Sequence, residues 1–152
     1  MLKPGDDAPD FELPDGQGGT FRLHTMLKDG PVVLYFYPAD FTPVCTKQAC
    51  MFRDAHQELA ARGVRVVGIN SKALHTHANF RKRHAIPFPL LSDPERKVIG
   101  PYGADGFLGL VRRISYLIGS DGRIVDAARG DLGLSEHKAF TERTLQRAAQ
   151  NS

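Results

Sequence analysis

Long hydrophobic runs are missing from this sequence of 152 residues, which also has no tryptophan and only two cysteines. Apolar runs such as residues 32–37 are far shorter than the roughly 20 residues that a membrane-spanning helix needs. No basic segment followed by an apolar stretch occurs near the first residue, so a secretory signal is not expected. We therefore predict a cytoplasmic protein with no membrane partner.

Charge of one sign is not concentrated along the chain. The formal net charge is +3, and the basic residues are scattered apart from a cluster at 81–84. That cluster falls in an expected helix and is interpreted as a solvated face, so no nucleic-acid partner is predicted. The sequence also lacks repeats and low-complexity linkers, and its 41% hydrophobic content can form a sizeable core. We predict one domain over residues 1–152.

Alternating strand and helix patterns predict an α/β fold with a central mixed sheet flanked by helices. Two apolar runs, 32–37 and 64–69, are typical of buried strands, and the segment 43–62 between them favours a helix. An Asp-Gly pair at 121–122 predicts a tight antiparallel hairpin. The remaining expected elements are a helix at 75–84, a strand at 90–91, a short helix from Ser92, strands at 114–118 and 123–127, and a final helix from Ser135 to about residue 149.

The first cysteine lies at the start of the helix expected at 43–62. Thr42 is a good N-cap residue and Pro43 suits the first helical position, which places Cys45 in the first turn. The unpaired N–H groups and the positive end of the helix dipole favour an anion there, so Cys45 is a candidate nucleophilic thiolate. These features alone leave open that Cys45 is a small buried residue without a chemical role.

Cys50 lies five residues further along the same helix. On an intact helix this spacing separates the Cα atoms by about 8.7 Å and turns the thiols to different faces. A disulfide tolerates only about 7 Å, so a Cys45–Cys50 bridge would require the first helical turns to unwind. Cys50 could instead be an inert packed thiol. Zinc binding is not expected, because only His56 follows nearby and no second ligand pair has metal-site spacing.

Pro38, Thr42 and Cys45 match a Pro-x-x-x-Thr-x-x-Cys motif, and in this respect the sequence resembles the peroxiredoxins. The resemblance extends over nearly the whole chain and is strongest to the Q-type, or bacterioferritin-comigratory-protein, group. The similar features are the four-residue gap between the cysteines and the segments 52–54, 87–93 and 113–118.

This resemblance implies a thioredoxin-like fold and a thiol-dependent peroxidase acting on hydrogen peroxide and organic hydroperoxides. It implies that Cys45 is the peroxidatic nucleophile and that Thr42 and Arg113 are its partners. Pro38 would shield the thiolate from solvent. Cys50 lies where part of the Q-type group keeps its resolving cysteine, which implies an intramolecular disulfide, the atypical 2-Cys route. Thioredoxin or a similar dithiol protein is the implied reductant.

The residue types fit this chemistry on physical grounds. Arg113 keeps its charge and presents planar donors, so it can hold a thiolate and polarise a peroxide, although taken alone it would more often be a surface residue beside Arg112. The Thr42 hydroxyl can accept from a helix N–H group and donate to the peroxide. Sulfenic acid on Cys45 would condense with Cys50, and no metal or organic cofactor is needed. We expect a monomer, with a weak dimer as the alternative.

Three places depart from the family pattern. Gln48 stands where a glutamate is usual, so it can accept a hydrogen bond but offers Arg113 no charge. Val44 replaces a common glycine, and its branched side chain could stiffen the first turn of the helix. Asn-Ser-Lys at 70–72 replaces a segment that commonly has serine and aspartate. The direction of their effect on the rate is open.

Two other functions remain open from the sequence. A general thiol/disulfide oxidoreductase would use a Cys-x-x-Cys pair, and here four residues separate the cysteines. A redox sensor or holdase, in which oxidation only unwinds a helix, would not need Thr42 and Arg113. The histidines are expected mostly at the surface, and none is assigned a catalytic part, although His77 falls where the Q-type group often has a histidine.

Overall fold

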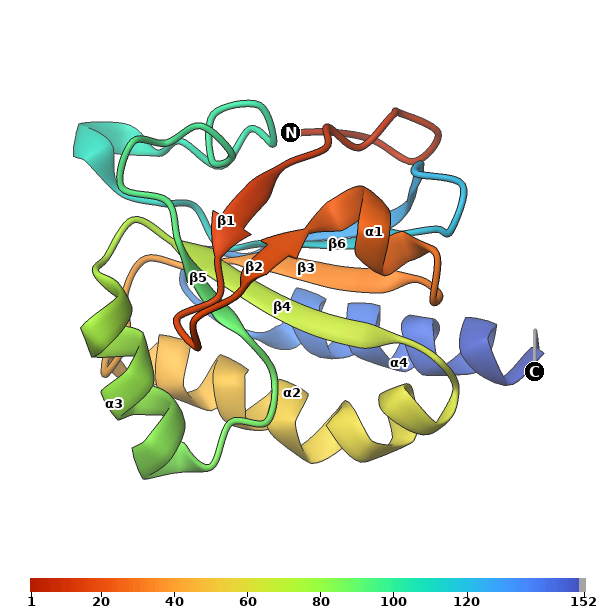
Figure 1. Cartoon of the computed structure of the whole chain (residues 1–152). Helices are drawn as coiled ribbons and strands as arrows, with labels where there is room; N and C mark the ends of the chain where they lie inside the picture. The colour runs from red at the N-terminus through yellow and green to blue at the C-terminus, as the bar shows by residue number, and fades with distance from the viewer. Residues whose placement is uncertain (151–152) are drawn as a thin grey trace.

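A five-stranded mixed β-sheet forms the centre of the computed structural model, which describes residues 1–150 (Figure 1). The last two residues of the predicted domain lie outside the described residues. The sheet order is β5-β4-β3-β6-β7, with parallel pairing among β3, β4 and β5 and antiparallel pairing of β6 to both neighbours. The predicted mixed sheet flanked by helices is confirmed. Its strands are β3 (Val32–Phe36), β4 (Arg65–Asn70), β5 (Leu90–Ser92), β6 (Ile114–Ile118) and β7 (Ile124–Arg129).

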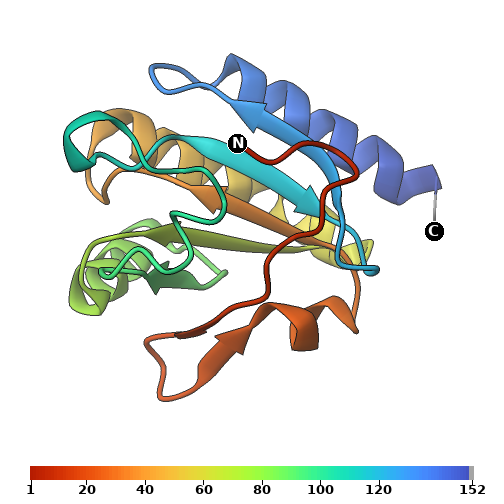
Figure 2. The same cartoon turned by 90° about the horizontal axis from the view of Figure 1, so that it is seen from above.

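Both faces of β3 are buried, because each of its residues is apolar or aromatic. Side chains alternate along a strand, so Val32, Leu34 and Phe36 enter one core cluster while Val33 and Tyr35 enter the other. Figure 2 shows the two coverings of the sheet on opposite sides. The second cluster is covered by the helices α2 (Pro43–Ala61), α3 (Leu74–His84) and α4 (Ser135–Gln150), and the first by β1 (Glu12–Pro14), β2 (Thr20–Arg22) and α1 (Leu23–Leu27).

The strands and long helices expected from the sequence are confirmed to within a few residues. The hairpin at Asp121-Gly122 joins antiparallel β6 and β7, and the Gly119 N–H group donates to the Arg123 carbonyl at 2.9 Å. Short elements with few residues and no clear periodicity are the ones that the sequence did not predict. They are β1, β2, α1 and the 3₁₀ helix η1 (Phe107–Gly109).

The short helix expected from Ser92 is wrong. Residues 94–103 form a series of turns instead, and Arg96 has a left-handed backbone with φ of +58°, which interrupts a right-handed helix. A side chain nevertheless binds the backbone N–H groups of this segment. The buried Asp93 carboxylate accepts hydrogen bonds from the N–H groups of Lys97, Val98 and Ile99 at 3.0, 2.8 and 2.8 Å.

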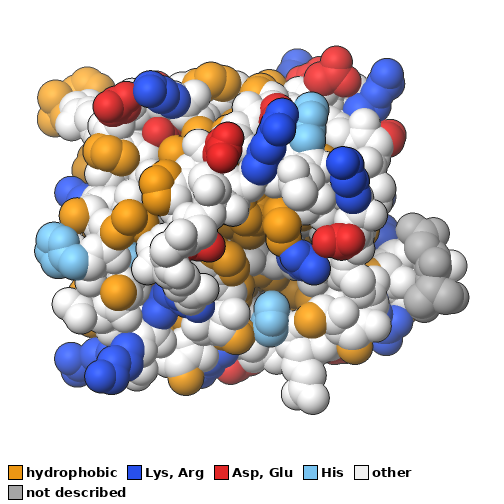
Figure 3. Space-filling view, viewed as in Figure 1, with side chains coloured by type: hydrophobic (Ala, Val, Ile, Leu, Met, Phe, Trp, Pro, Cys, Tyr) orange, Lys and Arg blue, Asp and Glu red, His pale blue; other side chains and the backbone are white. Residues whose placement is uncertain are grey.

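Charged side chains on the face shown in Figure 3 are scattered, with acidic and basic groups interspersed. This agrees with the dispersed charge in the sequence. No helix among residues 1–150 is both long and apolar enough to cross a membrane.

Candidate active site

The site begins at the loop that leads from the end of β3 into α2. Thr42 is the last residue before the helix, Pro43 is its first residue, and the Thr46 N–H group donates to the Thr42 carbonyl at 2.8 Å. Cys45 is therefore the third helical residue, as the sequence predicts, and its side chain is 1% exposed. The N–H groups of this first turn have no helical acceptor, so the thiol lies where an anion is favoured.

Arg113 reaches the thiol from the neighbouring strand. The antiparallel register pairs Phe36 with Ile114, so the residue before β6 lies beside the loop that follows β3. The Arg113 Nη2 atom is 3.2 Å from the Cys45 Sγ atom, and the arginine side chain is buried. Arg112 points elsewhere, because its Nε donates to the Asp105 carbonyl at 2.9 Å. The structure thus brings Cys45 together with the predicted arginine and not with its neighbour.

Gln48 completes the contact from within α2. It is fully buried one turn after Cys45, and its Oε1 accepts a hydrogen bond from Arg113 Nη1 at 2.7 Å. The neutral side chain therefore still orients the guanidinium, which the sequence left open. Among the described residues no carboxylate forms an ion pair with Arg113. A thiolate at Cys45 is consequently the anion that would balance the buried charge.

The backbone around Arg113 is fixed by the loop after β7. The Arg113 N–H group donates to Asp131 Oδ1 at 3.0 Å, and the Gly130 N–H group donates to the Arg113 carbonyl at 3.2 Å. His137 supports this loop, since its Nε2 lies 3.1 Å from the Gly130 carbonyl and its Nδ1 lies 2.8 Å from Ser115 Oγ. The carbonyl can only accept, so the neutral ring donates from Nε2 and accepts the Ser115 hydroxyl at Nδ1.

Two histidines are buried, although the sequence predicts that the histidines lie mostly at the surface. His77 and His137 are 2% and 0% exposed. A signal for His137 was present in the sequence, because it shares a helical stripe with Phe140, Thr141 and Thr144, all buried. Burial is the main cause of a lowered pKa at His137, and the charge of Arg113 lowers that pKa further.

The Thr42 hydroxyl does not cap α2, which corrects the expectation from the sequence. Its Oγ1 donates to the Ala39 carbonyl at 3.3 Å, and no side-chain hydrogen bond caps the helix. The Ala39 carbonyl in the preceding loop lies within reach of the Thr42 hydroxyl, so the hydroxyl turns toward this loop and away from the helix. Thr42 is exposed, which leaves its hydroxyl accessible from solvent.

An apolar cavity of about 290 Å³ adjoins the loop on the solvent side. Half-buried Pro38 lines it together with Val111, the polar or small residues Gly106, Arg112, Arg129 and Asp131, and three apolar side chains that are unusually exposed for their type. These are Phe107, Leu110 and Leu132, at 80%, 63% and 95% exposure. The start of the active-site loop therefore borders an open apolar surface.

Cys50 is half-buried on the same helix as Cys45, and both are free thiols. α2 runs without interruption from Pro43 to Ala61, so the helical separation expected from the spacing applies. The two cysteines cannot form a disulfide in this conformation.

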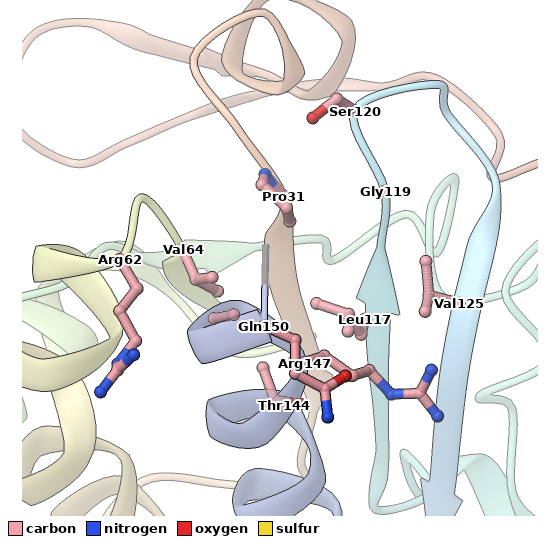
Figure 4. A pocket seen from close by; sticks show the side chains of 11 residues that line it. Pro31, Arg62, Val64, Leu117, Gly119, Ser120, Val125, Thr144, Arg147 and Gln150 are labelled. Atoms are coloured by element: carbon pink, nitrogen blue, oxygen red, sulfur yellow. The ribbon is translucent and has the colours of Figure 1, made fainter. Parts of the chain in front are cut away.

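A cavity of about 540 Å³ lies at the opposite end of β3, between α4 and the β6–β7 hairpin (Figure 4). Pro31, which precedes β3, is part of its lining, whereas the cysteine loop follows the other end of that strand. Neither cysteine lines it. Within residues 1–150, no group of three or more His, Cys, Asp or Glu side chains is placed to hold a metal ion.

A thioredoxin-like mixed sheet that places a buried helix-N-terminal thiol against an arginine defines a thiol-dependent redox enzyme. The model of the AhpC/TSA family matches residues 4–127, so the chain belongs to this family. It is 40% identical over 149 residues to the putative peroxiredoxin Rv1608c of Mycobacterium tuberculosis, covering 95% of this chain and 97% of that protein. It is 39% identical over 147 residues to the chloroplastic peroxiredoxin Q of Oryza sativa subsp. japonica, covering 95% of this chain and 67% of that protein.

The solved structures agree with this assignment. The crystal structure of peroxidoxin BcpB from Mycobacterium tuberculosis matches with a TM-score of 0.88 and 38% identity, covering 97% of this chain and 98% of that one. Peroxiredoxin Q of Xanthomonas campestris matches with a TM-score of 0.82 at 24% identity, covering 91% of each chain, which shows the shared fold. The chain is a peroxiredoxin of the Q-type group and acts as a thiol peroxidase.

Replacing Arg113 with Met should slow oxidation of Cys45 by hydrogen peroxide about 10²- to 10³-fold, the loss typical of removing one preorganised donor to developing charge. Arg112→Met is the matched control and should retain the wild-type rate, because Arg112 points toward Asp105. Quenched-flow mass spectrometry measures both rates directly. Equal losses in the two variants would contradict the assignment of Arg113.

The lowered pKa of His137 predicts a pH-dependent stability. Its pKa is about 6.5 in the unfolded chain and lower in the folded one, so the unfolded state binds more protons between these values. The free energy of unfolding should therefore fall as the pH is lowered from 7 through this window. Urea unfolding of His137→Gln should show a smaller fall than the wild type. Burial also lowers the pKa of His56. His56 is present in both the wild type and the variant, so its contribution to the pH dependence is the same in the two proteins. Identical pH profiles would contradict this cause.

Proposed function

We propose that this peroxiredoxin reduces hydrogen peroxide and organic hydroperoxides through Cys45, with Cys50 closing an intramolecular disulfide that a thioredoxin-type dithiol protein reduces. The observation that supports it most directly is the 3.2 Å contact between Arg113 Nη2 and the buried Cys45 Sγ. A buried guanidinium favours the thiolate, which is the nucleophilic form of a thiol. The same cation can polarise the peroxide oxygens.

In the first step the Cys45 thiolate attacks one oxygen of the O–O bond. The S–O bond forms as the O–O bond breaks, giving Cys45 sulfenic acid and hydroxide or alkoxide, which then takes up a proton. Sulfur is oxidised by two electrons and the peroxide is reduced by two. We assign the stabilisation of the leaving oxygen to Arg113 and to the free N–H groups of the first helical turn. We assign to the Thr42 hydroxyl a hydrogen bond to the peroxide, for which it must leave the Ala39 carbonyl.

In the second step the Cys50 thiol condenses with the sulfenic acid, forming the S–S bond and releasing water. The continuous helix keeps the cysteines apart, so this step requires the start of α2 to unwind. An external dithiol then reduces the disulfide by thiol–disulfide exchange and is itself oxidised. Val44 is half-buried in the first turn, and its branching opposes this unwinding.

The cycle needs no cofactor and can be completed by the single domain. We place it in the cytoplasm, where dithiol reductants keep thiols reduced, and we propose a monomer as the working unit. A redox sensor is the weaker alternative, because it gives no reason for an arginine buried against the thiol.

Intact-mass measurements after addition of stoichiometric hydrogen peroxide test the two cysteine roles. Wild-type protein should lose two hydrogen atoms, because both thiols enter one disulfide. Cys50→Ser should gain one or more oxygen atoms on Cys45, whereas Cys45→Ser should hardly react. Mass is the suitable readout, since the chain has no tryptophan to report the change by fluorescence.

Non-reducing peptide maps of the oxidised wild type provide the control, because a Cys45–Cys50 linkage must appear within one chain. A linkage between chains would replace the intramolecular route by an intermolecular one. Equal reactivity of the two variants would remove the distinction between nucleophile and resolving thiol.

The apolar cavity beside Pro38 supports organic hydroperoxides as substrates. Its lining by Phe107, Leu110 and Leu132 would bury an alkyl or aryl substituent while the peroxide group approaches Cys45. The Xanthomonas campestris bacterioferritin comigratory protein, a structural neighbour of this chain, is described by its alkyl peroxide reduction activity. Hydrogen peroxide has no such substituent and gains nothing from this surface.

Leu110→Ser should raise the KM for cumene hydroperoxide severalfold and leave the rate with hydrogen peroxide unchanged, because only the larger substrate uses the cavity. Leu108→Ser is the matched control, since Leu108 is also exposed on the same segment, at 84% against 63% for Leu110, but does not line the cavity. Steady-state kinetics with both peroxides measure the difference. A similar change for both substrates would contradict a substituent-binding role.

A further inference from the structure

The active-site loop, residues 37–42, is held against one face of α3. His77, Phe80 and His84 lie three to four residues apart, so they share one side of that helix. Phe41 packs edge-on against Phe80 with ring centroids 5.2 Å apart, and it is 6.3 Å from the ring of His84. The loop that delivers Cys45 is therefore anchored outside α2, on a neighbouring helix.

Buried hydrogen bonds make the central contact between loop and helix. The Tyr37 hydroxyl donates to Asp40 Oδ1 at 2.7 Å, and His77 Nδ1 lies 2.5 Å from Asp40 Oδ2. Burial raises the pKa of Tyr37 well above its usual value, so the phenol keeps its proton and donates. A carboxylate only accepts, so His77 donates from Nδ1. The side chains of His77 and Asp40 are 2% and 0% exposed, which makes the loss of either partner costly.

The loop also contains strained backbone. Phe41 has a φ of +62°, in the left-handed region that bulky residues avoid. Such a conformation persists only when surrounding contacts hold it. Asp40 and Phe41 are both fixed by α3, so these contacts oppose the release of the strain.

A second attachment lies downstream of the cysteines. Arg53 Nη1 donates to the His84 carbonyl at the end of α3 at 2.8 Å, and the adjacent Phe52 is fully buried against Tyr35 at 4.7 Å. Cys45 and Cys50 both lie between this attachment and Asp40. The part of α2 that must unwind for disulfide formation is thus bounded by two contacts with α3, and the upstream one is next to the strained residue.

We propose that Asp40 and His77 form a positioning clamp that sets the balance between the folded loop and the unwound state in which Cys50 meets Cys45. The inference rests on the proposed intramolecular disulfide. The closed clamp holds Cys45 at the helix N-terminus against Arg113, where it reacts with peroxide. Its opening releases Phe41 and the first turn of α2, which permits condensation with Cys50. The clamp therefore favours the first chemical step and opposes the second.

His77→Leu tests the clamp, because it removes the donor to Asp40. Oxidation of Cys45 by peroxide should slow roughly fivefold to tenfold, the effect of losing one hydrogen bond to a charged group. Disulfide formation from the sulfenic acid should become faster by a similar factor. The peroxide concentration that converts half of Cys45 to sulfinic acid should rise accordingly. Rapid quenching followed by intact mass analysis resolves all three quantities.

Two further variants distinguish positioning from mere structural support. His77→Asn keeps a donor near the position of Nδ1 and should restore wild-type partitioning between disulfide and sulfinic acid. Tyr37→Phe removes the other donor to Asp40 while retaining the ring, and it should shift the partition in the same direction as His77→Leu if that variant fails to fold. His75→Leu, an exposed site two residues away on α3, is the matched control and should behave as wild type.

The proposal is overturned if His77→Leu and Tyr37→Phe leave the partition unchanged, or if both chemical steps slow together in proportion to lost stability. The measurement on the wild-type protein distinguishes failure of the clamp from failure of the proposed function. A wild type that forms no Cys45–Cys50 disulfide would refute the resolution route itself, whereas a normal wild-type disulfide with unshifted variants would refute the clamp alone.

Discussion

The contact between Arg113 and Cys45 is the interaction on which the rest of the site depends. A guanidinium buried at 3% exposure is tolerated only with partners for its charge and its donors. The fold supplies them from separate places: Cys45 and Gln48 from one face of α2, and Asp131 and Gly130 from the loop after β7, which hold the backbone. The antiparallel pairing of β3 with β6 brings these segments together.

The proposed cycle places opposite requirements on α2 in its two chemical steps. The intact first turn of this helix concentrates unpaired N–H groups around Cys45, and this turn must be lost before Cys50 can bond to Cys45. A more stable helix start would strengthen the nucleophile and delay resolution. In the mechanism proposed above, Val44 and the contacts of Asp40 and Phe41 with α3 would act on this balance.

The sequence predicted those features that have strong local signals. The runs 32–37 and 64–69, the helix start at Thr42-Pro43 and the Asp121-Gly122 turn could be placed because periodicity and turn chemistry act over a few residues. The partnership of Arg113 with Cys45 came from family resemblance, since a separation of 68 residues leaves no local signal. The absent helix after Ser92 depends on a left-handed Arg96 that no residue-type preference indicates. The partners of His77 and His137 depend on tertiary packing, which local sequence patterns do not indicate.

The neutrality of Gln48 has a consequence for the oxidised protein. Conversion of the Cys45 thiolate to sulfenic acid removes the negative charge beside Arg113, and Gln48 offers only a dipole in its place. Oxidation thereby leaves a buried cation without a counter-ion, which disfavours the closed site electrostatically. A glutamate at this position would have left Arg113 with a counter-ion after oxidation. In the proposed cycle, oxidation of Cys45 would therefore destabilise the closed conformation in which it took place.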